Sequence, residues 1–245
     1  GKAYGFSGGA SDTEVFYTFT SFAYPPIVFR YNIKDNLSQV YKDTNINIDF
    51  SKFITKQIFY SSKDGTKIPM YITHKKDLVY NGKSPTLLYA YGGFNISINP
   101  SFSISRMLLL ENDGIYASAN IRGGGEYGEK WHEEGMLHNK QNVFDDFIFA
   151  ADYLVNNNFT NRKKLAIQGG SNGGLLIGAV INQRPDLCAV ALPSVGVMDM
   201  LRYAKFTIGW AWEVEYGDPN ESEEIFNYIY KYSPLHNIRS NGNYP

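Results

Sequence analysis

The fold is decided by residues 165–181, which read LAIQGGSNGGLLIGAVI. The apolar run before the glycines predicts a buried strand over 164–168, and the apolar run after them predicts a helix over 174–183. Between the two lies the pattern G-x-S-x-G, at Gly169, Ser171 and Gly173. Small residues on both sides of a serine allow a sharp turn that exposes its hydroxyl at a helix N-terminus. A glycine-rich turn can contain a serine by chance, but the flanking strand and helix favour Ser171 as a nucleophile.

Strands alternate with helices on both sides of this turn. Apolar runs at 86–91, 115–121 and 189–192 predict further buried strands, and residues 142–156 carry apolar side chains at helical spacing. A hairpin over 55–73, turned at Asp64-Gly65, precedes them. Runs that are apolar on both faces and separated by helices indicate an α/β fold, with a mostly parallel sheet covered by helices on both faces.

The first 45 residues have a different character. Short β-rich runs at 15–19 and 27–31 are broken by Pro25-Pro26 and by Asp35-Asn36, with no helical period. Two or three strands of this length cannot bury a core alone, so they are expected to belong to a larger all-β body. The polar stretch 41–45 then links the two parts. We therefore predict one domain over 1–45 and a second over 46–245.

Composition excludes several classes of protein. Hydrophobic residues make up 43% of the chain, enough for a sizeable core, but no apolar run approaches the roughly 20 residues of a membrane span. The formal net charge of −1 provides no field to attract nucleic acid or an anionic membrane. A single cysteine, Cys188, excludes an internal disulfide, and no leader segment opens the chain. We expect a cytoplasmic protein that recognises its partner with a pocket.

Acyl transfer at Ser171 would need hydrogen-bond donors for the oxyanion. The backbone N–H of Asn172, next to the nucleophile, is one. The second should come from the loop after the strand that ends at Tyr91, which reads Tyr91-Gly92-Gly93-Phe94. The alternative is a tight loop with two aromatic side chains in the core.

Three other patterns are better explained by structure than by chemistry. The sequence from Gly123 to Gly128 fits a dinucleotide-binding fingerprint, but no apolar helix follows it. His132 begins like a zinc-protease helix, but the next histidine is six residues away and would lie on another face. The carboxylate pairs 133–134 and 145–146 are expected to be solvated helix faces or caps.

Six motifs, taken in order, closely resemble the prolyl oligopeptidase family, which comprises serine peptidases of the α/β-hydrolase class. They are residues 89–94 (YAYGGF), 120–128 (NIRGGGEYG), 169–174 (GGSNGG), 182–187 (NQRPDL), 195–200 (VGVMDM) and 232–237 (YSPLHN). The resemblance runs over nearly the whole chain. It implies an α/β-hydrolase domain preceded by the last strands of a β-propeller.

The resemblance also implies roles for individual residues. Ser171 matches the nucleophile, and the Asn172 amide and the Tyr91 hydroxyl match the oxyanion hole. Trp212 is similar to the tryptophan that stacks on the substrate proline ring, although sequence alone favours a core tryptophan there. Positions that match the lining of that pocket or its neighbour are Phe94, Val197, Ile208 and Tyr216. A flat apolar wall suits a proline ring, which has no N–H to recognise.

The catalytic aspartate and histidine of the family follow the nucleophile, and neither matching segment occurs in these 245 residues. Asp199 and His236 stand in the right order. The segment from Ser171 to His236 is nevertheless too short for the strand–helix units that should precede the histidine, at about 30 residues each. They also match family positions without a catalytic role, so we interpret both as structural.

The sequence thus predicts a serine endopeptidase that cleaves short peptides after proline, with no cofactor and no metal. Its partners are short proline-containing peptides, not nucleic acid or a membrane, and the complete protein is expected to be a monomer. One alternative is a non-catalytic binding protein with a hydrolase fold. Another is a related dipeptidyl peptidase, acylaminoacyl peptidase or esterase. The 245-residue chain alone is expected to be inactive, because it lacks the catalytic histidine.

Overall fold

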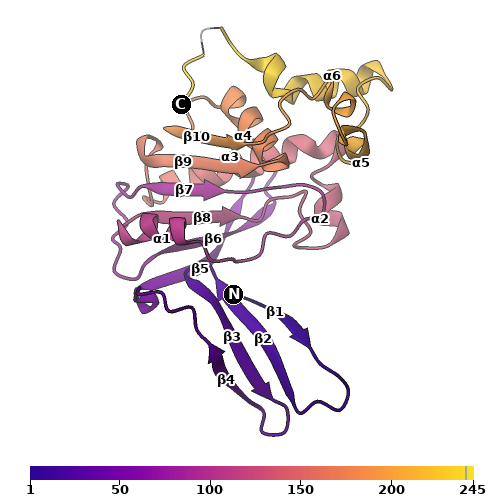
Figure 1. Ribbon diagram of the computed structural model, residues 1–245. Coiled ribbons are helices and arrows are strands. Elements are labelled where there is room, and N and C mark those ends of the chain that lie inside the picture. The colour runs from indigo at the N-terminus through magenta and orange to yellow at the C-terminus, as the bar shows by residue number, and fades with distance from the viewer. Residues whose placement is uncertain (241) are drawn as a thin grey trace. The chain divides into compact units, whose positions relative to one another are not determined.

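The computed structural model describes residues 1–240 and 242–245, which divide into two compact units (Figure 1). One unit comprises Gly1–Lys56, Thr73–Leu78 and Asn99–Asp113. The other comprises Gln57–Ile72, Val79–Ile98 and, among the described residues, the chain from Gly114 to Pro245. The candidate site lies in the second unit.

The first unit begins with a four-stranded antiparallel sheet in the order β1-β2-β3-β4. Its strands are β1 (Lys2–Ser7), β2 (Glu14–Ser21), β3 (Tyr24–Asn32) and β4 (Leu37–Lys42). Aromatic side chains on one face stabilise the pairing, because the rings of Phe6, Tyr17 and Phe29 stack at centroid distances of 5.1 and 5.3 Å. The predicted pair of strands is confirmed as β2 and β3.

Two expectations about this sheet are wrong in detail. The dipeptide Pro25-Pro26 does not break a strand but lies at the beginning of β3, a position where a missing N–H is tolerated. The stretch 41–45 is not entirely a linker, since β4 continues to Lys42, which pairs with Val28. β1 was not predicted. All of its side chains are exposed, and its sequence, KAYGFS, contains no continuous apolar run from which to predict a strand.

The second sheet has six strands in the order β10-β9-β7-β8-β6-β5. Their bounds are β5 (Phe53–Ser61), β6 (Lys67–Lys75), β7 (Thr86–Tyr89), β8 (Ile115–Ala119), β9 (Leu165–Gly170) and β10 (Val190–Ser194). The pairs β10/β9, β9/β7 and β7/β8 are parallel, as predicted, and β5 and β6 form the predicted hairpin around Gly65. β9 lies next to β7 rather than β8, so the strand order reverses there. At such points the carboxyl ends of parallel strands form a crevice that binds ligands.

The helices are α1 (Ile104–Glu111), α2 (Glu129–Glu133), α3 (Lys140–Asn156), α4 (Asn172–Gln183), α5 (Glu213–Tyr216) and α6 (Glu223–Tyr232). α3 and α4 are the two predicted helices. α3 buries an apolar face of which Val143, Phe147 and Leu154 are part, whereas α4 is buried almost all round. α4 packs against β9, β10 and α3. The other helices were not predicted, although Ser222 caps α6 as such residues do, its side chain accepting a hydrogen bond from the Ile225 N–H at 3.2 Å.

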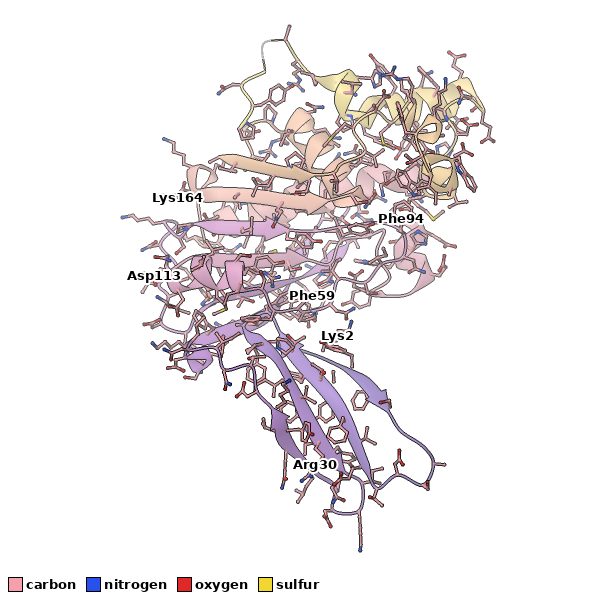
Figure 2. All side chains as sticks on the ribbon, viewed as in Figure 1. Lys2, Arg30, Phe59, Phe94, Asp113 and Lys164 are labelled. Carbon is pink, nitrogen blue, oxygen red and sulfur yellow. The ribbon has the colours of Figure 1, made fainter. Side chains whose placement is uncertain are left out.

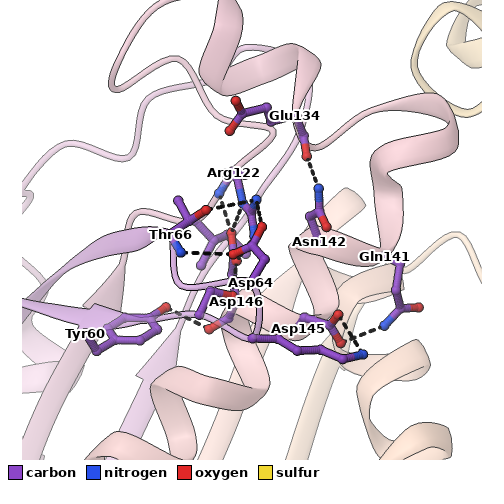
Figure 3. A network of polar contacts seen from close by, with 12 residues as sticks. Tyr60, Asp64, Thr66, Arg122, Glu134, Gln141, Asn142, Asp145 and Asp146 are labelled. Atoms are coloured by element: carbon purple, nitrogen blue, oxygen red, sulfur yellow. Dashed lines mark hydrogen bonds and ion pairs between the residues drawn. The ribbon is translucent and has the colours of Figure 1, made fainter.

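A buried ion-pair network around Arg122 ties three elements of this unit together (Figure 3). The guanidinium lies 2.6 Å from Asp146 Oδ1 in α3 and 2.6 Å from Asp64 Oδ2 in the β5–β6 turn. Tyr60 in β5 adds a hydrogen bond to the Asp146 carbonyl at 2.7 Å. The expectation of a solvated face at 145–146 is therefore wrong for Asp146, which is fully buried and neutralised by Arg122. Burial raises the pKa of Asp146, and the hydrogen bonds from Arg122 oppose that shift.

One edge of the six-stranded sheet is formed by β10, which is largely exposed. Two of its apolar side chains, Val190 and Leu192, keep 45% and 43% of their surface accessible. Among the described residues, no helix has the length and apolar character needed to cross a lipid bilayer.

Candidate active site

Ser171 occupies a strained turn between β9 and α4. Its backbone has φ 56° and ψ −118°, a conformation that L-residues other than glycine rarely adopt. The turn is held by main-chain hydrogen bonds, since the Ser171 N–H donates to the Ser194 carbonyl at 2.9 Å and the Ser171 carbonyl accepts from the Gly174 N–H at 2.8 Å. The residue is exposed. The predicted strand–turn–helix is therefore present, with the serine at its apex.

The glycines around Ser171 are required by close backbone contacts. A Cβ on Gly169 would overlap the Gly173 carbonyl oxygen. A Cβ on Gly173 would lie 2.9 Å from the Ala90 carbonyl oxygen, and one on Gly174 would lie 2.6 Å from the Cα of Gly196. Gly170 differs, because its nearest neighbour would be 3.8 Å away. The two glycines of the G-x-S-x-G pattern thus let β9, α4 and the segment at Ala90, just after β7, approach one another.

The Tyr91 phenol lies near enough to Ser171 for the serine side chain to influence its pKa. Burial raises the pKa of Tyr91 above its ordinary value, and the interaction with Ser171 acts in the opposite direction. The phenol is therefore protonated at neutral pH and available as a donor. Tyr91 lies in the loop after β7, which ends at Tyr89. Figure 2 shows that Phe94, on the same loop, lies at the opposite end of the sheet from Lys164, which precedes β9. The site thus lies at the carboxyl ends of the parallel strands.

Asn172 begins α4, and its side chain joins two other predicted residues. The amide nitrogen donates to the Tyr91 carbonyl at 2.7 Å, and the amide oxygen accepts from the Tyr216 hydroxyl at 2.9 Å. The ring of Tyr216 is buried and meets the edge of Phe94 at a centroid distance of 5.5 Å. The structure therefore brings together five of the predicted residues by direct contact: Ser171, Asn172, Tyr91, Tyr216 and Phe94.

The remaining three predicted residues lie on neighbouring segments. Trp212 ends a short 3-10 helix, η5 (Gly209–Trp212), and immediately precedes α5, which ends at Tyr216. Its surface is half-buried, whereas Ile208, before η5, is 57% exposed. Val197 is half-buried in the loop that follows β10.

His236 and Asp199 form a separate cluster. His236 Nδ1 lies 2.7 Å from Ser233 Oγ, and its Nε2 lies 4.0 Å from Asp199 Oδ1. Arg202 binds the other oxygen of that carboxylate at 2.5 Å, and the Ser233 hydroxyl also accepts from the Met200 N–H at 3.1 Å. These contacts join the loop after β10 to η6 (Pro234–Asn237), in keeping with the structural interpretation of both residues.

The sequence analysis missed a buried charged pair beneath the loop that follows Tyr91. Lys140 Nζ lies 3.2 Å from Glu215 Oε1 and donates to the Gly92 carbonyl at 3.1 Å. The second oxygen of Glu215 lies 2.8 Å from His132 Nε2. No local pattern links Lys140 with a residue 75 positions later, and His132 was considered only as a metal ligand.

Comparison with known proteins identifies the family. Residues 100–245 match the family described as "Prolyl oligopeptidase family". The chain belongs to this family. Two similar relatives are the prolyl endopeptidase of Elizabethkingia meningoseptica, 49% identical over 245 residues and 100% of this chain, and that of Dictyostelium discoideum, 48% identical over 248 residues and 98% of this chain. The chain therefore has the fold of this family, in which β-propeller strands precede an α/β-hydrolase domain.

Solved structures agree. A prolyl endopeptidase studied for the role of inter-domain dynamics superposes with a TM-score of 0.94 at 44% identity, covering 100% of this chain and 36% of the other. Prolyl oligopeptidase B from Galerina marginata, bound to a 35mer hydrolysis and macrocyclization substrate, has a TM-score of 0.94 at 40% identity, with 100% and 35% covered. The chain spans about a third of the length of the curated relatives that it matches.

Proposed function

We propose that the protein carrying this chain is a serine endopeptidase that hydrolyses short peptides on the carboxyl side of proline, through an acyl-enzyme on Ser171. The observation that carries the proposal is the strained turn at Ser171, which exposes the serine at the start of α4 and beside Tyr91. A serine in this position attacks a carbonyl carbon, and the N-terminus of α4 favours the negative charge that develops.

Two donors of this chain would stabilise the oxyanion. The backbone N–H of Asn172 opens α4, and the Tyr91 side chain lies beside Ser171. As Ser171 Oγ bonds to the peptide carbonyl carbon, its proton passes to a base, and the carbonyl oxygen takes the negative charge between the two donors. Return of the proton to the leaving amine breaks the C–N bond. Water then hydrolyses the ester by the same steps in reverse order.

The base is proposed to be a histidine outside residues 1–245. The chain contains four histidines, and each is engaged away from Ser171 in the described residues. His74 contacts the Lys75 carbonyl, His132 contacts Glu215, His138 packs on Tyr228 and His236 contacts Ser233. A serine without such a base is a weak nucleophile at neutral pH.

Selection for proline is proposed to rest on apolar contact with Trp212, Phe94, Val197, Ile208 and Tyr216. Trp212 is half-buried and precedes the helix that carries Tyr216, whose ring contacts Phe94. The relatives named prolyl endopeptidase support this specificity. A flat indole provides dispersion contact to a ring that offers no donor.

The test uses the full-length protein that contains this sequence. A fluorophosphonate probe should label Ser171, and Ser171→Ala should lower turnover of a blocked Gly-Pro reporter by about a thousandfold or more. A blocked Gly-Ala reporter, a free dipeptidyl reporter, an acylated amino acid and a simple ester distinguish the related peptidases and the esterase. Cleavage of Gly-Pro that persists in Ser171→Ala would contradict the proposal. Absence of any labelling in the native protein would favour a non-catalytic binding protein.

Three further features are proposed with the function. The domain boundary is placed at residue 45, in the segment between the end of β4 at Lys42 and the start of β5 at Phe53. A cytoplasmic location is supported by the presence of a single cysteine, Cys188, which is buried and forms no disulfide, with burial raising the pKa of its thiol to about 11. The complete protein is proposed to be a monomer that requires no cofactor or metal.

A further inference from the structure

A closed circuit of polar contacts links the loop after β7 to α5. Its first half runs from the Tyr91 carbonyl to the Asn172 side chain at 2.7 Å and on to the Tyr216 hydroxyl at 2.9 Å. Its second half runs from Glu215, the neighbour of Tyr216, to Lys140 at 3.2 Å and on to the Gly92 carbonyl at 3.1 Å. Two consecutive carbonyls of one segment are thus connected to two consecutive side chains of another.

The charged half of this circuit is deeply buried. The side chains of Lys140 and Glu215 keep 1% and 2% of their surface accessible. Glu215 has both oxygens satisfied, one by Lys140 and the other by His132. The Lys140 ammonium also lies 5.3 Å from the centre of the Tyr216 ring. Burial lowers the pKa of Lys140, and the Glu215 carboxylate opposes that shift.

The loop that Lys140 contacts has little freedom to relax elsewhere. Gly92 has φ +66°, and a Cβ there would lie 2.6 Å from Val143 Cγ1. A Cβ on Gly93 would lie 2.6 Å from Asn172 Nδ2. The peptide between these glycines is therefore enclosed by α3 and α4, and its carbonyl is directed at Lys140. A rotation of this peptide would move Tyr91, which precedes it.

Resting on the proposed function, we infer that Lys140 and Glu215 are positioning residues that hold the Tyr91–Gly93 loop and the Trp212–Tyr216 segment in one arrangement. They do not touch the substrate. Lys140 fixes the Gly92 carbonyl and thereby the direction of the Tyr91 hydroxyl toward the oxyanion. Glu215 fixes Lys140 to the segment that carries the proposed proline-stacking Trp212. Catalytic geometry and the proline pocket are thus coupled through one buried pair.

A purely structural ion pair would behave differently. Replacing both charges of a buried pair with neutral groups of similar volume is often neutral for stability, whereas removing one charge is costly because the other remains buried and unpaired. If Lys140 and Glu215 only neutralise each other, the double replacement restores activity together with stability. If Lys140 positions Gly92, the double replacement restores stability alone, since no donor reaches the carbonyl.

The experiment compares Lys140→Met, Glu215→Gln and the double variant in the full-length protein containing this sequence. Lys63→Met is the matched control, because Lys63 pairs with Asp145 of the same helix α3 at 3.2 Å but is 64% exposed. Four quantities are measured: the midpoint of thermal unfolding, kcat and KM for a blocked Gly-Pro reporter, and the rate at which a fluorophosphonate modifies Ser171. Rates are normalised to folded protein.

We expect Lys140→Met to lower the unfolding midpoint and to lower kcat and the phosphonylation rate at least tenfold, with KM changed less than threefold. The double variant should regain most of the midpoint, while kcat and phosphonylation stay at least tenfold below the native values. Glu215→Gln should lose less kcat than Lys140→Met, because Lys140 keeps its bond to Gly92. Lys63→Met should match the native protein in all four quantities.

Recovery of kcat in the double variant to within threefold of the native value would overturn the inference. So would a Lys140→Met protein that loses stability but keeps its rate per folded molecule. Failure of the proposed function is separate, because it would appear in the native protein as absence of Gly-Pro cleavage. Phosphonylation of Ser171 would still report on the loop geometry in that case, since the probe carries no proline.

Discussion

Ser171 and Tyr91 show how the surroundings prepare ordinary side chains for chemistry. The positive φ of Ser171 costs on the order of 1–3 kcal/mol and is sustained by the contacts around it, including its N–H bond to the Ser194 carbonyl. Burial raises the pKa of the Tyr91 phenol further above neutral pH, so the phenol remains protonated. A fixed donor next to an exposed hydroxyl is the arrangement that acyl transfer needs.

Removing the Tyr91 hydroxyl tests its proposed role as an oxyanion donor. Tyr91→Phe should lower kcat for a blocked Gly-Pro reporter by about a hundredfold, or roughly 3 kcal/mol, and change KM little, because the bond strengthens as charge develops on the carbonyl oxygen. Steady-state kinetics of the full-length protein measure both constants. An unchanged kcat with a raised KM would assign Tyr91 to substrate binding instead.

Trp212 is the residue expected to select proline. In Trp212→Ala the ratio of kcat/KM for Gly-Pro to that for Gly-Ala reporters should fall by a factor equivalent to about 1–3 kcal/mol, since the flat contact to the ring is lost. The neighbouring Trp210 is 63% exposed, and Trp210→Ala serves as the comparison. Equal losses on both reporters in Trp212→Ala would point to a role in folding rather than in selection.

The strand–turn–helix formed by β9 and α4, which carries the proposed nucleophile, is also a packing unit. Its glycines bring the backbone of β9 against α4 and the backbone of α4 against Ala90 and Gly196. The carbonyl end of β7 is thereby drawn to the N-terminus of α4. This close approach is the reason that Tyr91 and Asn172, which are far apart in sequence, share one site.

Two adjacent glycines offer a matched test of this packing. Gly169→Ala should destabilise the full-length protein by about 1–3 kcal/mol and impair activity, because its Cβ overlaps the Gly173 carbonyl. Gly170→Ala should be tolerated, because its Cβ finds its nearest neighbour at 3.8 Å. Thermal unfolding midpoints and active-site labelling provide the comparison. Equal destabilisation by the two substitutions would show that glycine flexibility, not space, is what the turn requires.

Across the described residues, Ser171 is exposed and each of the four histidines contacts a group other than Ser171. His236 contacts Ser233 and lies beside Asp199, and His132 contacts the carboxylate of Glu215. The edge strand β10 also exposes Val190 and Leu192, and exposed apolar edges favour association between chains.

Residues 1–245 produced alone should therefore show no peptidase activity. The expected result is an insoluble or self-associating chain that does not turn over a blocked Gly-Pro reporter, because Ser171 has no base. Size-exclusion chromatography and a reporter assay against the full-length protein measure this. Turnover near that of the full-length protein would be inconsistent with this account, and loss of that turnover in His236→Ala would identify His236 as the base.

The amino-acid sequence by itself determined the local pieces of this protein. The runs of apolar residues at 86–91, 115–121 and 165–168, and the helical spacing over 142–156, are sufficient to predict β7, β8, β9 and α3, because period and apolarity are local properties. The turn at Ser171 can also be predicted from sequence, because the glycines that it requires lie within a few residues of the serine. Elements without such a pattern, such as the fully exposed β1, could not be found this way.

The tertiary structure alone decided which distant side chains meet. The sequence predicts a solvated position for the carboxylate pair 145–146. Asp146 is nevertheless buried, because Arg122 from another element neutralises its charge. No local pattern links Lys140 with Glu215, yet the two side chains pair beneath the loop that follows Tyr91. A buried charge is stable only beside its partner, and the partner is supplied by the fold rather than by the neighbouring sequence.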